Sequence, residues 1–111
     1  MRTLLVLCCL SSAAVHAVLA PEHLREWPLL GAGFAAAAAL LLLAAVAVVR
    51  GSTRVLLPTA WLLIALVAAY AAVLPFEGEP VTRLALATKA IELVGVSAAL
   101  TAAGRRVAPR S

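Results

Sequence analysis

Three ionisable residues lie inside stretches that are otherwise apolar, and they are where this chain could do chemistry. Lys89 and Glu92 stand three positions apart in the last apolar stretch, and His16 lies near the end of the first. Residues at i and i+3 share one face of a helix, so Lys89 and Glu92 can pair. An ionisable group inside a long apolar stretch is costly if that stretch spans a membrane, and it marks a candidate site for a proton, an ion or a substrate.

Three interpretations of the Lys89–Glu92 pair stay open. It could be an ion pair that only makes an awkward helix tolerable, a proton- or substrate-handling group, or a contact with a partner subunit. The residues that share the face of Glu92 are small, so this face should pack against other helices. They are Ala85, Thr88, Gly95, Ala99 and Ala103. The alternative function is a small oligomeric transporter that uses a membrane-embedded Glu92.

His16 is followed by three further residues that bind metals or exchange protons: Glu22, His23 and Glu26. Imidazole and carboxylate groups could together hold a divalent ion such as Zn or Cu, or relay protons. The spacing matches no specific metal motif, and an ordinary polar loop would also account for it. We therefore predict a polar ion site at one end of the protein, comprising His16, Glu22, His23, Glu26, Lys89 and Glu92. In such a site His16 and Glu92 should lie close together.

Long apolar stretches must position these residues. The 111 residues are 65% hydrophobic and only 13% charged. Four stretches, residues 3–20, 28–49, 55–74 and 84–103, are each about as long as the roughly 20 helical residues that cross a bilayer. Short connections between them imply antiparallel neighbours. We predict an all-α chain with one membrane domain (residues 1–111), folded as a transmembrane four-helix up-down-up-down bundle.

The charges outside these stretches divide by side. Six basic residues fall on one side: Arg2, Arg50, Arg54, Arg105, Arg106 and Arg110. Arg25 and Arg83 fall on the other side, with Glu22, Glu26, Glu77 and Glu79. Short cytoplasmic loops are enriched in Lys and Arg, so this pattern predicts a multi-pass protein of the cytoplasmic (inner) membrane with both termini cytoplasmic.

The first stretch has a second interpretation as a signal peptide, because Arg2 precedes an apolar run and small residues end at Ala20. Pro21 would then follow the cleavage point directly, where it is poorly tolerated, so we expect the stretch to be retained as a helix. Cys8 and Cys9 are adjacent and should act as small core residues rather than as a disulfide.

Local signals refine the helices. Pro28 should start the second helix and Gly51 should end it, whereas residues 21–27 should form a loop that could include a short helical turn along the membrane surface. Small residues four apart predict two packing stripes, Gly31/Ala35/Ala39 and Gly95/Ala99/Ala103. Trp61 lies deeper in its stretch than the interfacial aromatic residues Trp27 and Tyr70, and it is expected to pack between helices.

The sequence offers no support for an enzyme. It has no phosphate-cradling glycine loop, no nucleophile elbow and no Asp residue. The net charge of +4 is dispersed between the apolar stretches and does not suggest nucleic-acid binding. The expected partners are the lipid bilayer and either further copies of the chain or another membrane protein.

The polar residues after His16 also carry a resemblance. The segment Pro21-Glu22-His23-Leu24-Arg25-Glu26-Trp27-Pro28-Leu29-Leu30-Gly31, with His16 before it and Phe34 after it, resembles a pattern in small uncharacterised four-span membrane proteins of GC-rich, actinobacterial-type bacteria. The resemblance implies a membrane bundle and no known activity. In length and span number the chain is also similar to small multidrug resistance transporters, which carry a Glu in the first span where this chain has His16.

Overall fold

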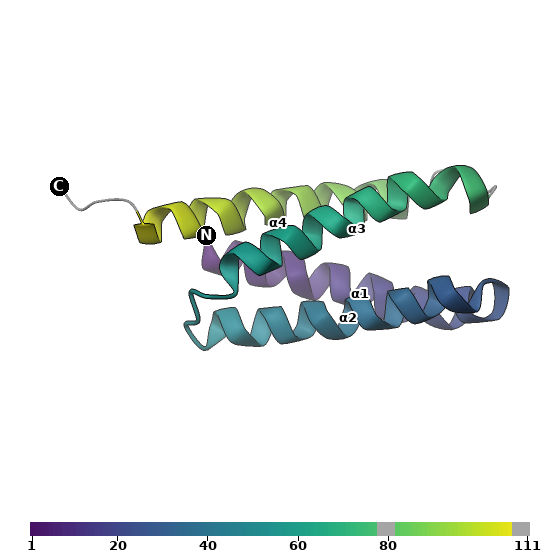
Figure 1. Ribbon diagram of the computed structural model, residues 1–111, viewed down its shortest axis with the longest axis horizontal. Coiled ribbons are helices and arrows are strands. Elements are labelled where there is room, and N and C mark those ends of the chain that lie inside the picture. Colours follow the sequence, from purple (N-terminus) through teal and green to yellow (C-terminus); the bar gives the residue numbers. More distant parts are fainter. Residues whose placement is uncertain (78–81, 108–111) are drawn as a thin grey trace.

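The computed structural model describes residues 1–77 and 82–107, and this part of the chain forms four helices. They are α1 (Arg2–Glu26), α2 (Pro28–Val49), α3 (Leu56–Glu77) and α4 (Arg83–Val107). Figure 1 shows them lying along the long axis, with the start of α1, the α2–α3 turn and the end of α4 at the same end. The prediction of an all-α, up-down-up-down four-helix bundle is confirmed. Glu79 and Arg110 of the charge pattern lie outside the described residues.

The first connection differs from the prediction. α1 continues through Pro21 to Glu26, and Trp27 alone separates it from α2. The predicted loop over residues 21–27 was wrong, and the helical conformation left open for this segment is present as the end of α1. Pro21 removes one backbone hydrogen bond but its φ suits a helix. The chain breaks before Pro28 instead, because a residue that precedes proline is pushed out of the helical region. Trp27 is extended accordingly, with φ −144° and ψ 92°.

The second connection follows the sequence signals. α2 ends at Val49, and the Arg50 N–H still bonds the carbonyl of Val46. Gly51 has φ 87°, a conformation that residues with a side chain rarely adopt. The predicted glycine-closed turn is confirmed. The other ends shift by a few residues: α3 runs to Glu77, past the predicted stretch 55–74, and α4 runs to Val107, past the predicted stretch 84–103.

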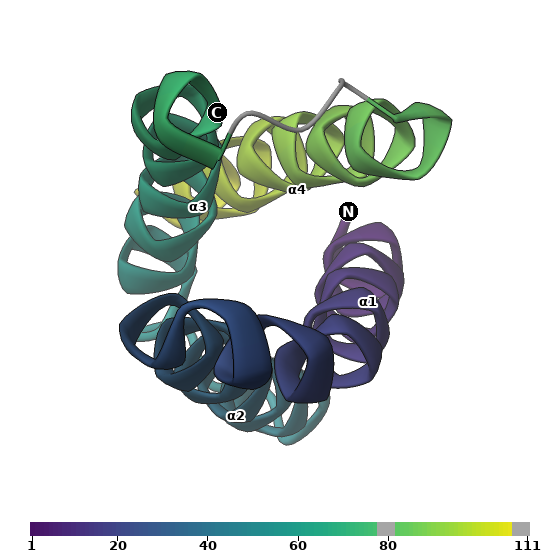
Figure 2. The same cartoon turned by 90° about the vertical axis from the view of Figure 1, so that its right-hand side faces the viewer.

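The helices form two hairpins that meet unevenly. α1 packs closely on α2, and α3 packs on α4. The hairpins are joined mainly through α1 and α4, whereas α2 and α3 make few contacts. Seen from the end that holds Trp27, the four helices follow one another around a ring in chain order (Figure 2).

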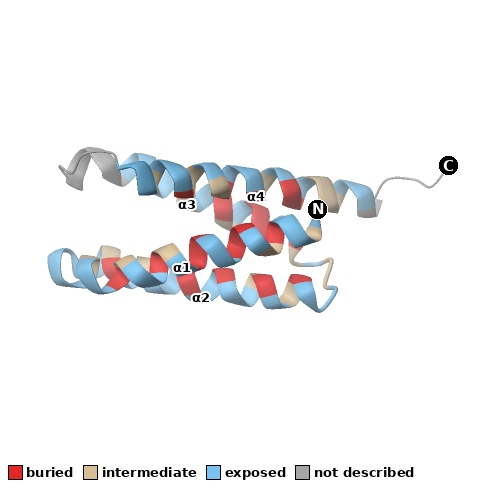
Figure 3. Ribbon diagram, turned by 180° about the vertical axis from the view of Figure 1, so that it is seen from behind, coloured by how far each residue is buried: buried red, intermediate tan, exposed pale blue. Residues whose placement is uncertain are grey.

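The core lies along the inner faces of the helices, where buried positions alternate at spacings of three and four (Figure 3). In α2 the buried series includes Gly31, Ala38, Leu41, Ala45 and Val48. In left-handed helical bundles the buried residues of each helix follow this alternating spacing, and their side chains interlock with those of the neighbouring helices.

Small residues allow close approach at two places. A Cβ on Gly95 would lie 2.9 Å from Leu63 Cδ1 and 3.1 Å from Cys8 Cβ, so α4 meets α1 and α3 there. A Cβ on Gly31 would collide with the backbone of Leu24 in α1. Ala35 and Ala39 are exposed, however, so the predicted stripe in α2 was wrong beyond Gly31. A strict four-residue step drifts across a helix face, whereas the buried seam alternates three and four.

The outer surface is apolar. Trp61 is 68% exposed, so its expected place between helices was wrong. Lipid solvates apolar side chains, so such residues need not turn inward. By length and composition α1, α2 and the segment Arg83–Arg105 of α4 can each cross a membrane. Within the described residues, α3 contributes a shorter apolar helix, Leu56–Ala72.

Candidate functional site

Glu92 lies at the centre of a buried polar network between α1 and α4. Its side chain has no exposed surface. Oε1 accepts a hydrogen bond of 2.7 Å from Lys89 Nζ in the preceding turn of α4. Oε2 accepts one of 2.5 Å from the Ser12 hydroxyl of α1. The predicted Lys89–Glu92 pair is therefore present, and it is joined to the other hairpin.

His16 lies one helical turn beyond Ser12 on the same face of α1. Its Nε2 is 3.9 Å from Glu92 Oε2, so the expected approach of these two residues is confirmed. Its Nδ1 lies 2.7 Å from the Ser12 carbonyl oxygen and 3.3 Å from the Ser12 hydroxyl. A carbonyl only accepts, so this contact assigns the ring hydrogen to Nδ1.

The assignment leaves an unusual pairing on the other side of the ring. In neutral His16, Nε2 is an acceptor, and it faces Oε2 of a carboxylate, which is also an acceptor. One proton placed on either atom would turn this contact into a favourable one. At 3.9 Å the two atoms are beyond hydrogen-bond distance, so a proton on His16 would interact with the carboxylate through its charge.

Lys89 is less enclosed than Glu92, with 15% of its side chain exposed. Besides Glu92, its Nζ lies 3.5 Å from the carbonyl oxygen of Leu66 in α3 and 5.3 Å from the centre of the Tyr70 ring. The ammonium group thus connects α4 to α3, and the aromatic face adds an attraction for its charge.

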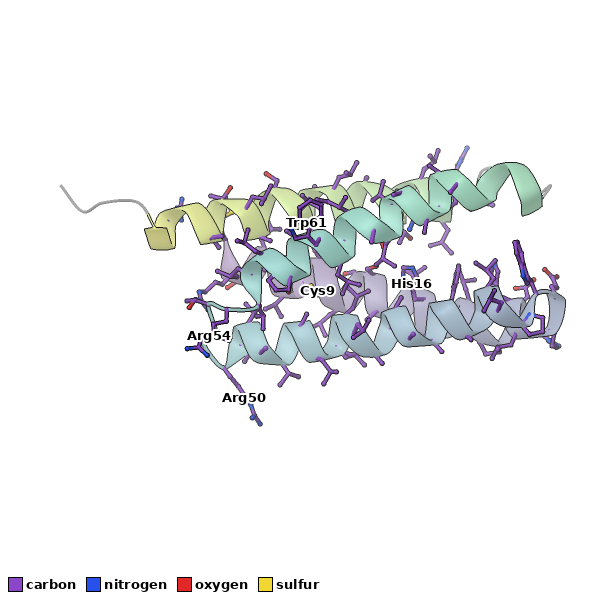
Figure 4. The ribbon with its side chains drawn as sticks, in the orientation of Figure 1. Cys9, His16, Arg50, Arg54 and Trp61 are labelled. Carbon is purple, nitrogen blue, oxygen red and sulfur yellow. The ribbon has the colours of Figure 1, made fainter. Side chains whose placement is uncertain are left out.

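A cavity of about 170 Å³ adjoins the network where α2 and α3 separate. Its wall is mostly apolar, and His16 and Lys89 are among the residues that line it. The remaining lining residues are Leu30, Gly33, Phe34 and Ala37 of α2 and Leu66, Ala69 and Tyr70 of α3. In Figure 4 His16 lies on the inner side of its hairpin, toward the gap between the two pairs of helices.

The other three predicted site residues lie farther along α1. Glu22 and Glu26 are exposed. His23 stacks on Phe34, with ring centres 4.3 Å apart, and Phe34 also contacts the His16 ring at 5.1 Å. The Nδ1 atom of His23 lies 2.9 Å from the carbonyl oxygen of Leu19. Of the six predicted residues, the structure gathers His16, Lys89 and Glu92 in one network.

Metal coordination is not favoured by this arrangement. Among the residues that the structure describes, no three His, Cys, Asp or Glu side chains come together in a group that could hold an ion. Lys89 stands beside Glu92, where it would repel a cation. Cys8 and Cys9 are buried and unbridged in the N-terminal half of α1, as expected of core residues, and Figure 4 labels Cys9.

Ser12 and Tyr70 are site residues that the sequence did not single out. Ser12 shares a helical face with His16, and this i, i+4 spacing was the available signal. Tyr70 could not be assigned to the site, because its role depends on how α3 packs beside α4.

Basic residues gather at the opposite end of the bundle. Arg2 Nη1 donates to the carbonyl oxygen of Val48 at 3.3 Å, which ties the start of α1 to the end of α2. Arg2 and Arg105 line one surface hollow, and Arg50 and Arg54 project from the nearby turn (Figure 4). The described charges are thus divided between the two ends.

No protein-family model, curated protein or solved structure matches this chain.

Proposed function

We propose that this chain is an integral protein of the cytoplasmic membrane that takes up and releases a proton at the Ser12–His16–Lys89–Glu92 network. The observation that carries the proposal is the pairing of His16 Nε2 with Glu92 Oε2 at 3.9 Å beside a cavity. Ionisable groups buried within membrane helices mark proton and ion sites by default.

The surroundings favour a proton over a metal ion. Lys89 already neutralises Glu92, and Ser12 supplies the second hydrogen bond to the carboxylate. An added proton needs only the acceptor atoms His16 Nε2 and Glu92 Oε2, whereas a metal ion needs several ligands. Glu22 and Glu26 are exposed and cannot act as ligands at the buried site.

Among the described residues, the cavity that adjoins the network opens on one side of it. The cavity reaches His16 and Lys89 from the α2–α3 side. Toward the basic end, the interior is filled by apolar side chains that include Leu5, Cys9, Leu41 and Leu63. This supports proton exchange with one face of the site rather than a continuous path through the bundle.

The proposed topology has four spans, with both termini cytoplasmic and the site in the outer half. It rests on the basic end formed by Arg2, Arg50, Arg54 and Arg105, since short cytoplasmic loops are enriched in Arg and Lys. α1 is retained in this arrangement, because it supplies Ser12 and His16 to the network.

Nuclear magnetic resonance of the imidazole nitrogens tests the proposal directly, because the chain has only two His residues. Protein labelled with ¹⁵N-histidine is titrated in detergent micelles, and the His16 signal is assigned with H16Q. We expect the His16 signal to respond to pH in the wild type and to respond differently in E92Q. The matched control is E22Q, which alters an exposed carboxylate on the same helix and should leave the His16 titration unchanged.

A second variant guards against a folding defect, because E92Q leaves Lys89 without its partner. In K89M/E92Q both members of the pair are neutral, and the His16 titration should again differ from that of the wild type. A His16 signal that ignores pH, or that titrates identically in all variants, would show that the network is only structural.

A further inference from the structure

The cavity beside the network has features that proton exchange does not require. Its volume of about 170 Å³ slightly exceeds the roughly 150 Å³ of an engineered apolar cavity that binds benzene. A single six-membered ring with small substituents therefore fits it. Phe34 of α2 and Tyr70 of α3 both line this space and offer aromatic surface to such a ring.

The polar side of the cavity selects the chemistry of the ring. An ammonium group has three donors and no acceptor. Lys89 uses one donor on Glu92 at 2.7 Å and reaches the Leu66 carbonyl at 3.5 Å, the far limit for a hydrogen bond. A donor is thus left for an acceptor on a ligand, such as a carbonyl oxygen.

The charge balance favours a neutral ligand. Lys89 and Glu92 cancel one another, and His16 adds no charge when it carries a hydrogen only on Nδ1. A charged head group of either sign would meet a pair that is already neutral, so its own charge would stay uncompensated in a medium of low dielectric constant.

The entrance to the cavity lies on the lipid side. Gly33 and Ala69 line it from α2 and α3, and both are small and exposed. α2 and α3 make few contacts, so this seam does not close over the space between them. A ligand that enters here must be soluble in lipid.

We infer that the cavity binds the head group of a lipid-soluble quinone, with a ring carbonyl on Lys89 and the apolar tail directed between α2 and α3. The inference rests on the proposed function in sharing His16 and Lys89, but it concerns binding alone. No electron transfer by the protein is involved.

The probe is a benzoquinone with a decyl tail, titrated calorimetrically into the purified protein in micelles. Decylbenzene, which has the ring and the tail without a carbonyl, is the matched ligand. We expect the quinone to bind at least about tenfold more tightly, the effect of one hydrogen bond to a charged group.

Two variants locate the binding. G33L places a side chain in the entrance, and it should weaken quinone binding at least tenfold. A Cβ at Gly33 would meet nothing within 4 Å. The same is true of Gly104, which lies near the C-terminal end of α4 and does not line the cavity, so G104L is the matched control. In K89M/E92M, which removes both charges together, the preference for quinone over decylbenzene should disappear.

Equal affinity of the wild type for the two ligands, or binding by G33L as tight as by G104L, would overturn the inference. The titration of His16 is measured without any probe, so its result is separate. Quinone binding can fail while the coupling of His16 to Glu92 persists, and the two proposals are then told apart.

Discussion

Replacing Lys89 alone should be far more damaging than replacing it together with Glu92. In K89M the Glu92 carboxylate keeps its bond from Ser12 but loses the cation at 2.7 Å, and its side chain has no exposure to water. The double variant K89M/E92M leaves no charge in the network, and Met is close in size to both residues that it replaces.

The magnitude follows from the burial of the pair. Removing one partner of a buried ion pair costs about 3–5 kcal/mol, because the other charge is left uncompensated. Exchanging both partners for apolar residues of similar volume is commonly neutral, to within about 1 kcal/mol, or stabilising. The coupling energy in the double-mutant cycle should therefore be about 3 kcal/mol or more. For a fold stabilised by about 5–15 kcal/mol this is a large effect.

Unfolding in mixed micelles, followed by the loss of helical circular dichroism as a denaturing detergent is added, gives the four free energies of the cycle. E92M completes the set and leaves Lys89, which is partly exposed, as the unpaired charge. We expect E92M to be milder than K89M, since Lys89 can move its charge toward the cavity. If K89M and the double variant were equally destabilised, the charge of Glu92 would not be the cause, and the reasoning would be refuted.

Two further predictions concern neighbouring contacts. S12A should lower the free energy of unfolding by about 1.5–3 kcal/mol, the value of a hydrogen bond to a charged group, whereas S11A, at an exposed position, should change it by less than about 0.5 kcal/mol. Detergent-induced unfolding measures both, and equal effects would contradict the Ser12–Glu92 bond. G31A should destabilise the fold by about 1–3 kcal/mol, because the added methyl group meets the backbone of Leu24, whereas G33A should be tolerated. The thermal midpoints of the two variants measure this difference. A G31A variant as stable as G33A would contradict the close contact of α1 and α2.

Much of the fold could be predicted because lipid imposes simple rules. Apolar segments of membrane-spanning length read directly as helices, and Pro28 and Gly51 mark helix ends through backbone restrictions that need no tertiary context. The same independence explains the Lys89–Glu92 pair, since residues at i and i+3 on a helix meet whatever surrounds them.

The rest depended on packing between helices. Trp61 turned outward and Ala35 and Ala39 did not pack, because in lipid the apolar character of a residue does not say which face is buried. The extension of α1 past Pro21 placed Glu22 and Glu26 on a continuous helix rather than in a loop over the network. Only the meeting of α1 with α4 showed that Ser12 is the residue that reaches Glu92.

The placement of both members of the ion pair on α4 bears on how the protein is assembled. Because Lys89 and Glu92 neutralise each other within a single helix, the second hairpin of the proposed topology would carry no net charge at the depth of this pair on entering a bilayer. Ser12 and His16 come from the hairpin made first, so the remaining hydrogen bonds form when the two halves dock. The docking of the α1–α2 hairpin on the α3–α4 hairpin therefore does not have to neutralise a buried charge, and it only adds hydrogen bonds to a pair that is already neutral.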